Sequence, residues 1–349
     1  MAQLIGGDVD DMRTDSGKIY RVGIDWLTLY NFELTYKNTN FISEKITDEF
    51  YQESFKKEEP SYSIEFTKRL YEEGKETNFQ SLRINPNKIL YGHNIHNARS
   101  EELSQAIDIL IKKLDEEGII LDLKNAKIKD IEINLNIPKP FRELKETFEL
   151  LFSDVPGAKK IGRLTPNKSY KHMFEDETIY GSYNYSLVKV YDKTEESKLD
   201  IDITRLEWRF LKRTYANIMK AQEVDNSLNQ LLLDFTVIDK LFVEKTKSKL
   251  FIKGMNYLEK VLKKNLEIEY IRFKENNKLG VSLGKKEKRG VFKHLEETCW
   301  IFDYSFLIEL VSKYDKPHKS REIKNIKSKF SNHNNLEKIN YLMEIIFNH

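Results

Sequence analysis

Hydrophobic and polar residues alternate along three short segments, at 130–135, 187–193 and 203–210, as they do in β-strands with one buried face. The hydrophobic positions are Ile131, Ile133, Leu135, Val188, Val190, Leu206, Trp208 and Phe210. The polar positions are Asp130, Glu132, Asn134, Lys189, Tyr191, Lys193, Arg205, Glu207 and Arg209. If the three strands are neighbours, their polar side chains meet on one side of a sheet.

The remaining periodicity before residue 214 predicts more strands and two helices. Strands are expected at 19–34, 61–68, 79–91, 127–137, 177–180 and 185–191, with a polar stretch near 37–60. Ser100 with two following glutamates marks the start of a helix that runs to Glu117, and Arg142 to Phe152 forms a second amphipathic helix. This order predicts an α+β fold in which helices cover an antiparallel sheet.

The chain becomes largely helical after Tyr215. Apolar residues recur at three- and four-residue intervals in 222–250, 254–266, 302–313 and 335–347. We therefore expect a flexible N-terminus at 1–18, an α+β domain at 19–214 and a mainly helical domain at 215–349.

Charge is divided in the same way along the chain. Residues 211–349 carry a net charge of +9 and residues 1–210 a net charge of −7. A basic segment beside an acidic one is typical of a protein that meets phosphate with the first and gathers carboxylates in the second. Surface charge can also segregate without function, and the division alone does not separate the two readings.

Cysteine content and hydropathy set the compartment that we expect. Cys299 is the single cysteine, which excludes an internal disulfide framework and favours a reducing compartment. No apolar run is long enough for a membrane span, and the acidic start of the chain is unlike a signal peptide. The expectation is a cytoplasmic protein without a membrane partner.

The predicted polar sheet face holds the groups of a phosphodiester-cleaving site. Asp130, Glu132, Asn134 and Glu207 offer the hard oxygen ligands that Mg²⁺ or Mn²⁺ prefers. Tyr191 supplies a phenol oxygen for in-line attack if a metal, a lysine or a general base assists it. The alternative reading is an exposed sheet face that carries solvated cross-strand charge pairs.

Two stretches resemble the replication initiators of rolling-circle plasmids and filamentous phage. They are Glu177–Glu196, which contains Thr-Ile-Tyr-Gly-Ser and Tyr-Asp-Lys-Thr-Glu-Glu, and Thr204–Arg209, which reads Thr-Arg-Leu-Glu-Trp-Arg. The segment Ile128–Asn134 is similar to the metal-binding strand of that family, and Gly23–Leu29 is similar to its opening strand. The resemblance covers residues 19–212.

The resemblance implies a relative of the HUH endonuclease fold and a role for each site residue. Glu132 and Glu207 would bind the metal, and Tyr191 would become linked to a 5′-phosphate. Lys193 and Arg205 would hold the phosphate. The reaction implied is nicking and rejoining of one DNA strand.

The sequence departs from that family in one signature. The paired histidines of the standard metal-binding strand are absent, and carboxylate and amide side chains occupy that strand instead. His93 and His96 offer two histidines elsewhere, either as ligands or as part of a loop that enters a helix. Tyr180, Tyr183 and Tyr185 stand close enough in sequence to Tyr191 to be alternative nucleophiles.

Basic residues outside the predicted metal site are candidates for contact with DNA phosphates. Solvated helix faces also explain such runs. The candidates are Lys189, Arg209, Lys285, Lys286, Lys288, Arg289, Lys319, Arg321, Lys324 and Lys327.

These features together predict a metal-dependent replication initiator that nicks a plasmid or phage origin. The expected partner is origin DNA, single-stranded at the nick, with a host helicase, a polymerase and a second copy of the chain as further partners. A conjugative relaxase has the same chemistry. A non-enzymatic origin-binding protein and a soluble interaction protein are the alternatives from other classes.

Overall fold

The computed structural model describes residues 19–37, 43–47, 49–152, 178–183, 185–194, 201–211, 214–257 and 335–347. The chain divides into two compact units. The first comprises Met1–Glu143, Pro156–Glu244 and His349, and the second comprises Leu144–Val155 and Lys245–Asn348. A functional division at residue 214 stays a prediction.

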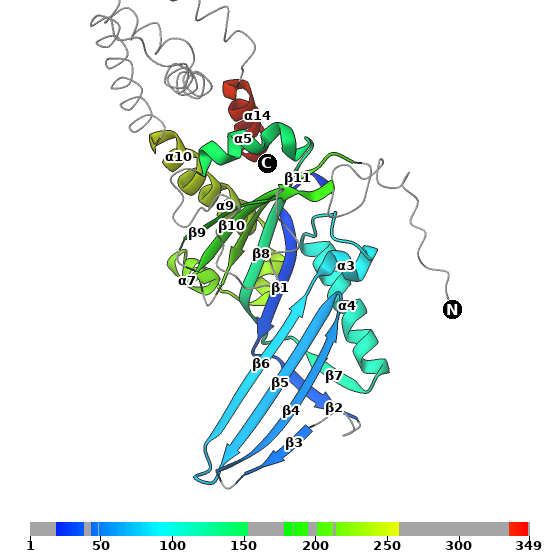
Figure 1. The fold of residues 1–349 in the computed structure, drawn as a ribbon. Helices are drawn as coiled ribbons and strands as arrows, with labels where there is room; N and C mark the ends of the chain where they lie inside the picture. Colours follow the sequence, from blue (N-terminus) through cyan, green and yellow to red (C-terminus); the bar gives the residue numbers. More distant parts are fainter. Residues whose placement is uncertain are drawn as a thin grey trace, which may run out of the picture. The chain divides into compact units, whose positions relative to one another are not determined.

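A nine-stranded antiparallel sheet is the centre of the first unit, which confirms the predicted α+β class (Figure 1). Its strands, in spatial order, are β3 (Ser43–Ile46), β4 (Phe50–Glu59), β5 (Tyr62–Tyr71), β6 (Glu76–Ile84), β1 (Gly23–Tyr30), β8 (Lys127–Ile137), β11 (Thr204–Phe210), β10 (Ser186–Asp192) and β9 (Thr178–Tyr183). The three segments with alternating pattern, β8, β11 and β10, are neighbours, as predicted.

The alternation places hydrophobic side chains on one face of these strands, here called the apolar face. Its central residues are fully buried, and they are Ile24, Leu27, Ile131, Ile133, Leu135, Leu206, Trp208, Phe210, Val188 and Val190. Burying a side chain of this size stabilises a fold by about 1.5 to 3 kcal/mol. The opposite side, the polar face, carries Glu132, Glu207 and Tyr191.

Local sequence explains the helices that connect the central strands. In α3 (Pro86–Tyr91), the Asn85 side chain accepts a hydrogen bond from the Lys88 backbone, Pro86 occupies the first turn, and Gly92 ends the helix with a φ of 74°. The predicted strand at 79–91 is therefore wrong after Ile84. In α4 (Ser100–Glu116), Glu102 accepts a hydrogen bond from the Arg99 backbone N–H at 3.2 Å.

The helices after residue 214 are shorter than the periodicity predicts. In the first unit they are α7 (Thr214–Ala221), α8 (Leu228–Leu233) and α9 (Thr236–Thr246), whose last two residues belong to the second unit. A single helix was expected at 222–250, but it is interrupted after Leu233. There the Asp234 carboxylate accepts a hydrogen bond from the Thr236 backbone N–H and starts a new helix.

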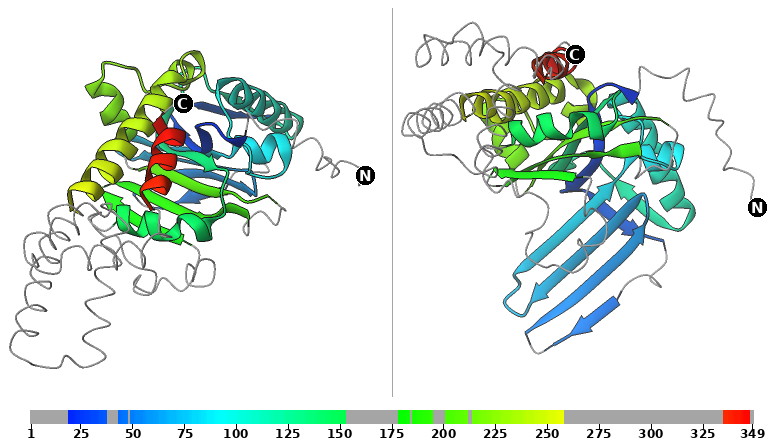
Figure 2. Two further views of the ribbon diagram at one scale, coloured as in Figure 1. Left: turned by 90° about the horizontal axis from the view of Figure 1, so that it is seen from above. Right: turned by 45° about the horizontal axis from the view of Figure 1, so that its top comes forward.

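Strands β4, β5 and β6 extend beyond the rest of the first unit as an arm (Figures 1 and 2). The polar stretch at 37–60 thus forms β3 and β4. The apolar side of the arm is covered by α4 and by a small sheet of β2 (Glu33–Tyr36) and β7 (Ile119–Asp122). The rings of Tyr36 and Phe55 lie 5.5 Å apart, and Lys113 of α4 lies 5.2 Å from the Tyr62 ring.

The described part of the second unit is helical. It consists of the larger part of α5 (Phe141–Leu151), a π-helical turn η2 (Lys247–Phe251), α10 (Ile252–Tyr257) and α14 (Asn335–Phe347). The rings of Phe251 and Phe347 are 5.2 Å apart. A Cβ on Gly254 would lie 2.7 Å from the Leu151 carbonyl oxygen, so the absence of a side chain allows α10 to approach α5.

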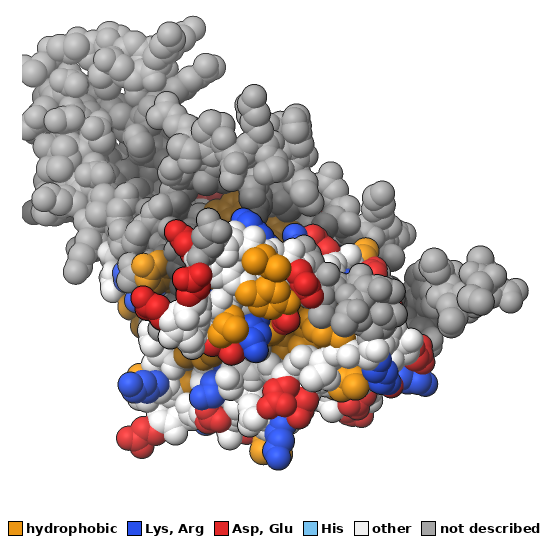
Figure 3. Space-filling model, turned by 90° about the horizontal axis from the view of Figure 1, so that it is seen from below, with side chains coloured by type: hydrophobic (Ala, Val, Ile, Leu, Met, Phe, Trp, Pro, Cys, Tyr) orange, Lys and Arg blue, Asp and Glu red, His pale blue; other side chains and the backbone are white. Residues whose placement is uncertain are grey.

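The described surface shows no region of a single charge in the view of Figure 3. Basic and acidic side chains alternate there with hydrophobic ones. Among the described residues, the helices are too short or too polar to span a bilayer.

A substitution at Gly23 tests how closely β1 packs against the loop before α4. A Cβ at this position would lie 2.6 Å from the Asn97 carbonyl carbon, and β1 is hydrogen-bonded to this loop from Ile24 to Ala98. We expect Gly23→Ala to lower the free energy of unfolding by about 1 to 3 kcal/mol because the loop must move away. Urea denaturation measures the change.

Gly74 is the contrasting position, since it has a φ of 74° and no heavy atom within 4 Å of an added Cβ. Gly74→Ala introduces backbone strain in an exposed turn and costs about 1 kcal/mol. Equal stability of Gly23→Ala and the unmodified protein would contradict the close packing of β1 against the loop.

Candidate metal centre and tyrosine site

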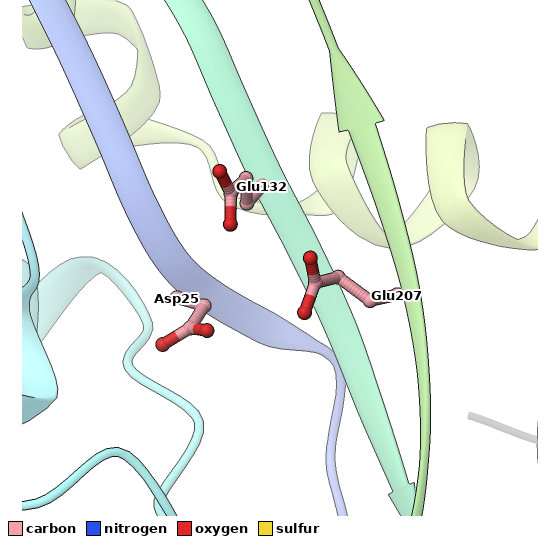
Figure 4. A group of neighbouring side chains, drawn as sticks. All are labelled: Asp25, Glu132 and Glu207. Carbon is pink, nitrogen blue, oxygen red and sulfur yellow. The ribbon is translucent and has the colours of Figure 1, made fainter. Parts of the chain in front are cut away.

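Three buried carboxylates from three strands converge on the polar face (Figure 4). Asp25 of β1, Glu132 of β8 and Glu207 of β11 each offer an oxygen atom, and these atoms all lie within 4.8 Å of one another. This acidic cluster is the arrangement that can hold a metal ion in the part of the chain that the structure describes. Its oxygen donors suit a hard divalent cation such as Mg²⁺ or Mn²⁺.

A β-bulge brings Asp25 into the acidic cluster. Ile24 pairs with Ile133 and Trp26 pairs with Glu132, so Asp25 is the extra residue between two regular pairs. The bulge breaks the alternation and places Asp25 on the polar face. The Asn85 side chain donates a hydrogen bond of 2.9 Å to Asp25 Oδ1 and fixes its orientation.

Four cationic side chains surround the acidic cluster. Lys189 Nζ lies 2.7 Å from Glu207 Oε1, and Arg205 Nη1 lies 3.6 Å from Asp25 Oδ2. Arg209 Nε and Arg83 Nη2 approach Glu132 Oε1 at 3.0 and 3.2 Å. The cations offset the mutual repulsion of three acids that are removed from water.

The protonation of the cluster reflects its burial. Removal from water, followed by repulsion from Glu207, raises the pKa of Glu132 to about 7 although Arg209 and Lys189 act in the opposite direction. The nearby Glu207 and Glu132 carboxylates raise the pKa of Lys189 above its usual range against the effect of burial. Glu132 is therefore only partly ionised near neutral pH, and a bound cation would compete with its proton.

Asn134 and Asp130, the other two predicted ligands, occupy different positions. Asn134 is fully buried on β8, opposite Glu207, and neither polar atom of its amide has a hydrogen-bond partner among the described residues. A buried amide without a partner is costly, which is consistent with a ligand site. Asp130 is half-buried further along β8, opposite Thr28, and lies outside the acidic cluster.

The Tyr191 hydroxyl reaches the acidic cluster directly. It donates a hydrogen bond of 3.3 Å to Glu207 Oε2, and the residue is 4% exposed. Lys189 Nζ and Lys193 Nζ lie 5.1 and 5.8 Å from the centre of the Tyr191 ring. The phenol hydroxyl therefore contacts a carboxylate that can accept its proton, and two positive charges lie near its ring.

The other candidate tyrosines are separated by the pleat of β9 and β10. Tyr180 pairs with Lys189 and shares its face of the sheet. Tyr183 lies on the opposite side, where its ring stacks on Trp208 at 6.1 Å. Tyr185 is in the turn between the strands and is 53% exposed. Tyr180 is thus the alternative to Tyr191 on the same face.

Lys193 and Arg205 are fully buried beneath the loop that follows α3. Lys193 Nζ donates a hydrogen bond of 2.8 Å to Asn94 Oδ1. Arg205 Nη2 donates one of 3.0 Å to the Ile95 carbonyl, and its Nε donates one of 2.8 Å to Asn136. Both cations therefore connect the loop to the strands of the acidic cluster.

The histidines lie in the same loop and not in the acidic cluster. The rings of His93 and His96 are 5.1 Å apart, and His96 meets the Tyr91 ring edge-on at 4.4 Å. Burial, with the positive charge of Lys193, lowers the pKa of His93. Neither histidine belongs to the metal-capable group found among the described residues.

Two residues of this site were not predicted from the sequence. Asp25 lies within the strand that resembles the family's opening strand, but a regular alternation gives no reason to group it with Glu132. Arg83 belongs to a segment predicted as an unremarkable strand. For Asp25 the signal was a carboxylate inside a strand that is otherwise hydrophobic. Arg83 stands in a strand with many polar residues, which gives no such signal.

The remaining predicted DNA contacts fall into two groups. Lys189 and Arg209 lie on the polar face in ion pairs with the acidic cluster. The residues of the C-terminal half are outside the described part of the chain, and they are Lys285, Lys286, Lys288, Arg289, Lys319, Arg321, Lys324 and Lys327.

Comparison with known proteins gives limited similarity. No family model matches the chain, and no curated protein matches it. The structure of a rolling circle replication initiator protein from Geobacillus stearothermophilus aligns over 58% of this chain and 78% of its own chain. The sequence identity is 13% and the TM-score is 0.30.

If Mn²⁺ binds to the acidic cluster, it should stabilise the folded protein against thermal unfolding. At a Mn²⁺ concentration a hundred times the Kd, we expect the free energy of unfolding to rise by about 2.7 kcal/mol. Glu207→Gln should remove this increase, and Glu65→Gln, at an exposed position on the arm, should retain it. Differential scanning calorimetry with and without Mn²⁺ measures both.

The same binding should weaken as the pH falls. Because the pKa of Glu132 is raised to about 7, a proton competes with the metal below that pH. The Kd for Mn²⁺ should rise about tenfold per pH unit below pH 7 and stay nearly level above it. A Kd that is independent of pH between 6 and 8 would exclude Glu132 as a ligand.

Proposed function

We propose that this protein is a divalent-metal-dependent endonuclease that nicks and rejoins one strand of DNA through Tyr191. The observation that carries the proposal is the hydrogen bond from the Tyr191 hydroxyl to Glu207, a carboxylate that is also part of the acidic cluster. A nucleophile, a proton acceptor and a metal-capable group are thereby within one hydrogen-bonded unit.

The donor set fits Mg²⁺ or Mn²⁺. Asp25, Glu132 and Glu207 supply carboxylate oxygens, and the buried amide of Asn134 lies beside Glu207 and has no partner in the described part of the chain. These four residues would hold the ion. A divalent ion held there would polarise a phosphate oxygen and offset charge that develops during displacement at phosphorus.

The charge balance of the site favours a phosphodiester. Four cations surround the ionised Asp25 and Glu207 and the partly protonated Glu132, so the group has an excess of positive charge before a metal binds. A bound divalent ion would increase this excess. A nucleic-acid phosphate brings the negative charge that such a site lacks, which a neutral substrate does not.

The chemistry of the chain's own residues is a balanced transesterification. The Tyr191 oxygen attacks phosphorus, its proton passes to Glu207, and the bond from phosphorus to the 3′-oxygen breaks. The released 3′-oxygen takes up a proton, so that a tyrosine–phosphate ester and a free 3′-hydroxyl result. The positive charges of Lys189 and Lys193, which lie near the Tyr191 ring, would favour loss of the phenol proton.

The biological setting that we propose is initiation of replication at a plasmid or phage origin. The motifs of residues 177–209 and the basic composition of residues 211–349 support it. The free 3′-hydroxyl would serve a polymerase. Arg205 would contribute by holding Asp25 and the loop at Ile95, in addition to its positive charge.

Substitution of the nucleophile is the direct test. Tyr191→Phe keeps the ring and removes the attacking oxygen, so a covalent protein–DNA adduct should be lost while metal binding remains. Tyr180→Phe, on the same face of the sheet, is the matched control and should retain the adduct. Denaturing gel electrophoresis of labelled origin DNA incubated with protein and Mn²⁺ detects the adduct.

The result also separates the alternatives. An adduct formed by Tyr191→Phe but not by Tyr180→Phe would move the nucleophile to β9. Origin binding without nicking in any metal would identify a non-enzymatic origin-binding protein. Absence of both would leave an interaction protein.

A further inference from the structure

The polar face continues from the acidic cluster onto the arm. Arg83 of β6 pairs with Thr28 of β1, which in turn pairs with Asp130 of β8. By the same alternation, Phe79 of β6, Arg69 of β5 and Phe50 of β4 lie on this side. We call this surface the arm face.

Three cations lie over aromatic rings at successive positions along the arm face. Nearest the acidic cluster, the Arg83 guanidinium is 4.1 Å from the Trp26 ring centre. Further along, Lys129 Nζ is 5.2 Å from the Phe79 ring. Towards the tip, the Arg69 guanidinium is 5.3 Å from the Phe50 ring. These three cation–ring pairs form a row that begins at the ion pair of Arg83 with Glu132.

Two of these cations, Arg69 and Lys129, form no close ion pair with a carboxylate in the described part of the chain. The polar contact of Arg69 is with the neutral amide oxygen of Gln52, at 2.7 Å, and its ring contact is with Phe50. Lys129 lies over the Phe79 ring. Phe79 is itself 44% exposed, so a hydrophobic ring and a positive charge are presented to solvent together.

The acids on the arm face are Asp130, which follows Lys129 in β8, and Glu58 and Glu65 of the arm. Glu58 pairs with Lys56 at 3.6 Å on β4, and Glu65 is opposite Lys56. They lie at the end of β4 and β5 away from Arg69, Tyr71 and Phe50. Arg69, Phe50 and Tyr71 lie together near the tip of the arm face, where the rings of Phe50 and Tyr71 are 5.8 Å apart and the exposed acids Glu72 and Glu73 occupy the adjoining turn.

We propose that the arm face binds single-stranded DNA next to the cleaved phosphodiester. The inference rests on the proposed function for the identity of the cleaved strand. Bases stack on exposed rings and guanidinium planes, and phosphates pair with the cations between them. In a duplex the faces of the bases are already stacked on one another, so exposed rings on the protein cannot stack on them. The row of rings therefore favours an unpaired strand as the ligand.

Binding of a labelled oligo(dT) of about 15 nucleotides to the full chain tests the proposal, with Mn²⁺ absent to prevent cleavage. Arg69→Ala should raise the Kd about tenfold, and Phe79→Leu, which keeps hydrophobic area but removes the ring, should raise it about fivefold. The slope of log Kd against log salt should fall by about 1 for Arg69→Ala. Fluorescence anisotropy gives both quantities.

Lys68→Ala is the matched control. Lys68 is the neighbour of Arg69 on β5, is partly exposed and carries the same charge, but its side chain is on the other face and pairs with Glu76 at 3.3 Å. We expect its Kd to equal that of the unmodified protein. Equal weakening by Lys68→Ala and Arg69→Ala would show non-specific attraction and overturn the proposal, as would undetectable binding by the unmodified protein or tighter binding to the matching duplex.

Measurements of oligo(dT) binding and of nicking together distinguish failure of the arm-face proposal from failure of the nuclease proposal. Glu207→Gln should bind oligo(dT) as the unmodified protein does and fail to nick. If Arg69 proves necessary for binding but the unmodified protein never nicks, DNA binding by the arm face is supported and the nuclease proposal is rejected. If nicking occurs but Arg69→Ala binds oligo(dT) normally, only the proposal of DNA binding by the arm face is rejected.

Discussion

The proximity of three buried carboxylates is the constraint on which the polar face of this protein depends. Asp25, Glu132 and Glu207 repel one another and have lost their hydration. Such a group is stable only if cations or a metal ion offset it. The ring of lysine and arginine around the cluster does so without a metal, and it leaves the excess of positive charge that an incoming phosphate would neutralise.

The backbone of the sheet is built around that cluster. Antiparallel pairing sets Glu207 beside Asn134 and Arg209 beside Glu132, and the bulge in β1 turns Asp25 to the same side. The loop after α3 then closes over the end of the cluster through Arg205 and Lys193. Each contact involves a different strand or loop, so no single segment contains the site.

The tyrosine and the arm extend the same face in opposite directions. Tyr191 adds a hydroxyl to the cluster from β10, on one side, and Arg83 links it to the row of rings on the other. A strand of DNA that followed this surface would pass from the rings of the arm to the Tyr191 hydroxyl, which we propose as the nucleophile. The sheet would thus both guide and cleave one strand, with its hydrophobic core on the opposite face.

The sequence by itself determined which side chains share a face of each strand, because a period of two is set by strand geometry alone. Glu132 and Asn134, Lys189 and Tyr191, and Arg205 and Glu207 could therefore be grouped in advance. It also determined α4, through its first turn and its apolar stripe.

The tertiary structure decided the rest. Asp25 joins the acidic cluster through a bulge, and the order of the strands places Tyr183 against Trp208 on the opposite face. Segment 86–91 became a helix because its cap competed successfully with its strand-like composition. Bulges, strand order and cross-strand contacts depend on residues far apart in the chain, which no local pattern records.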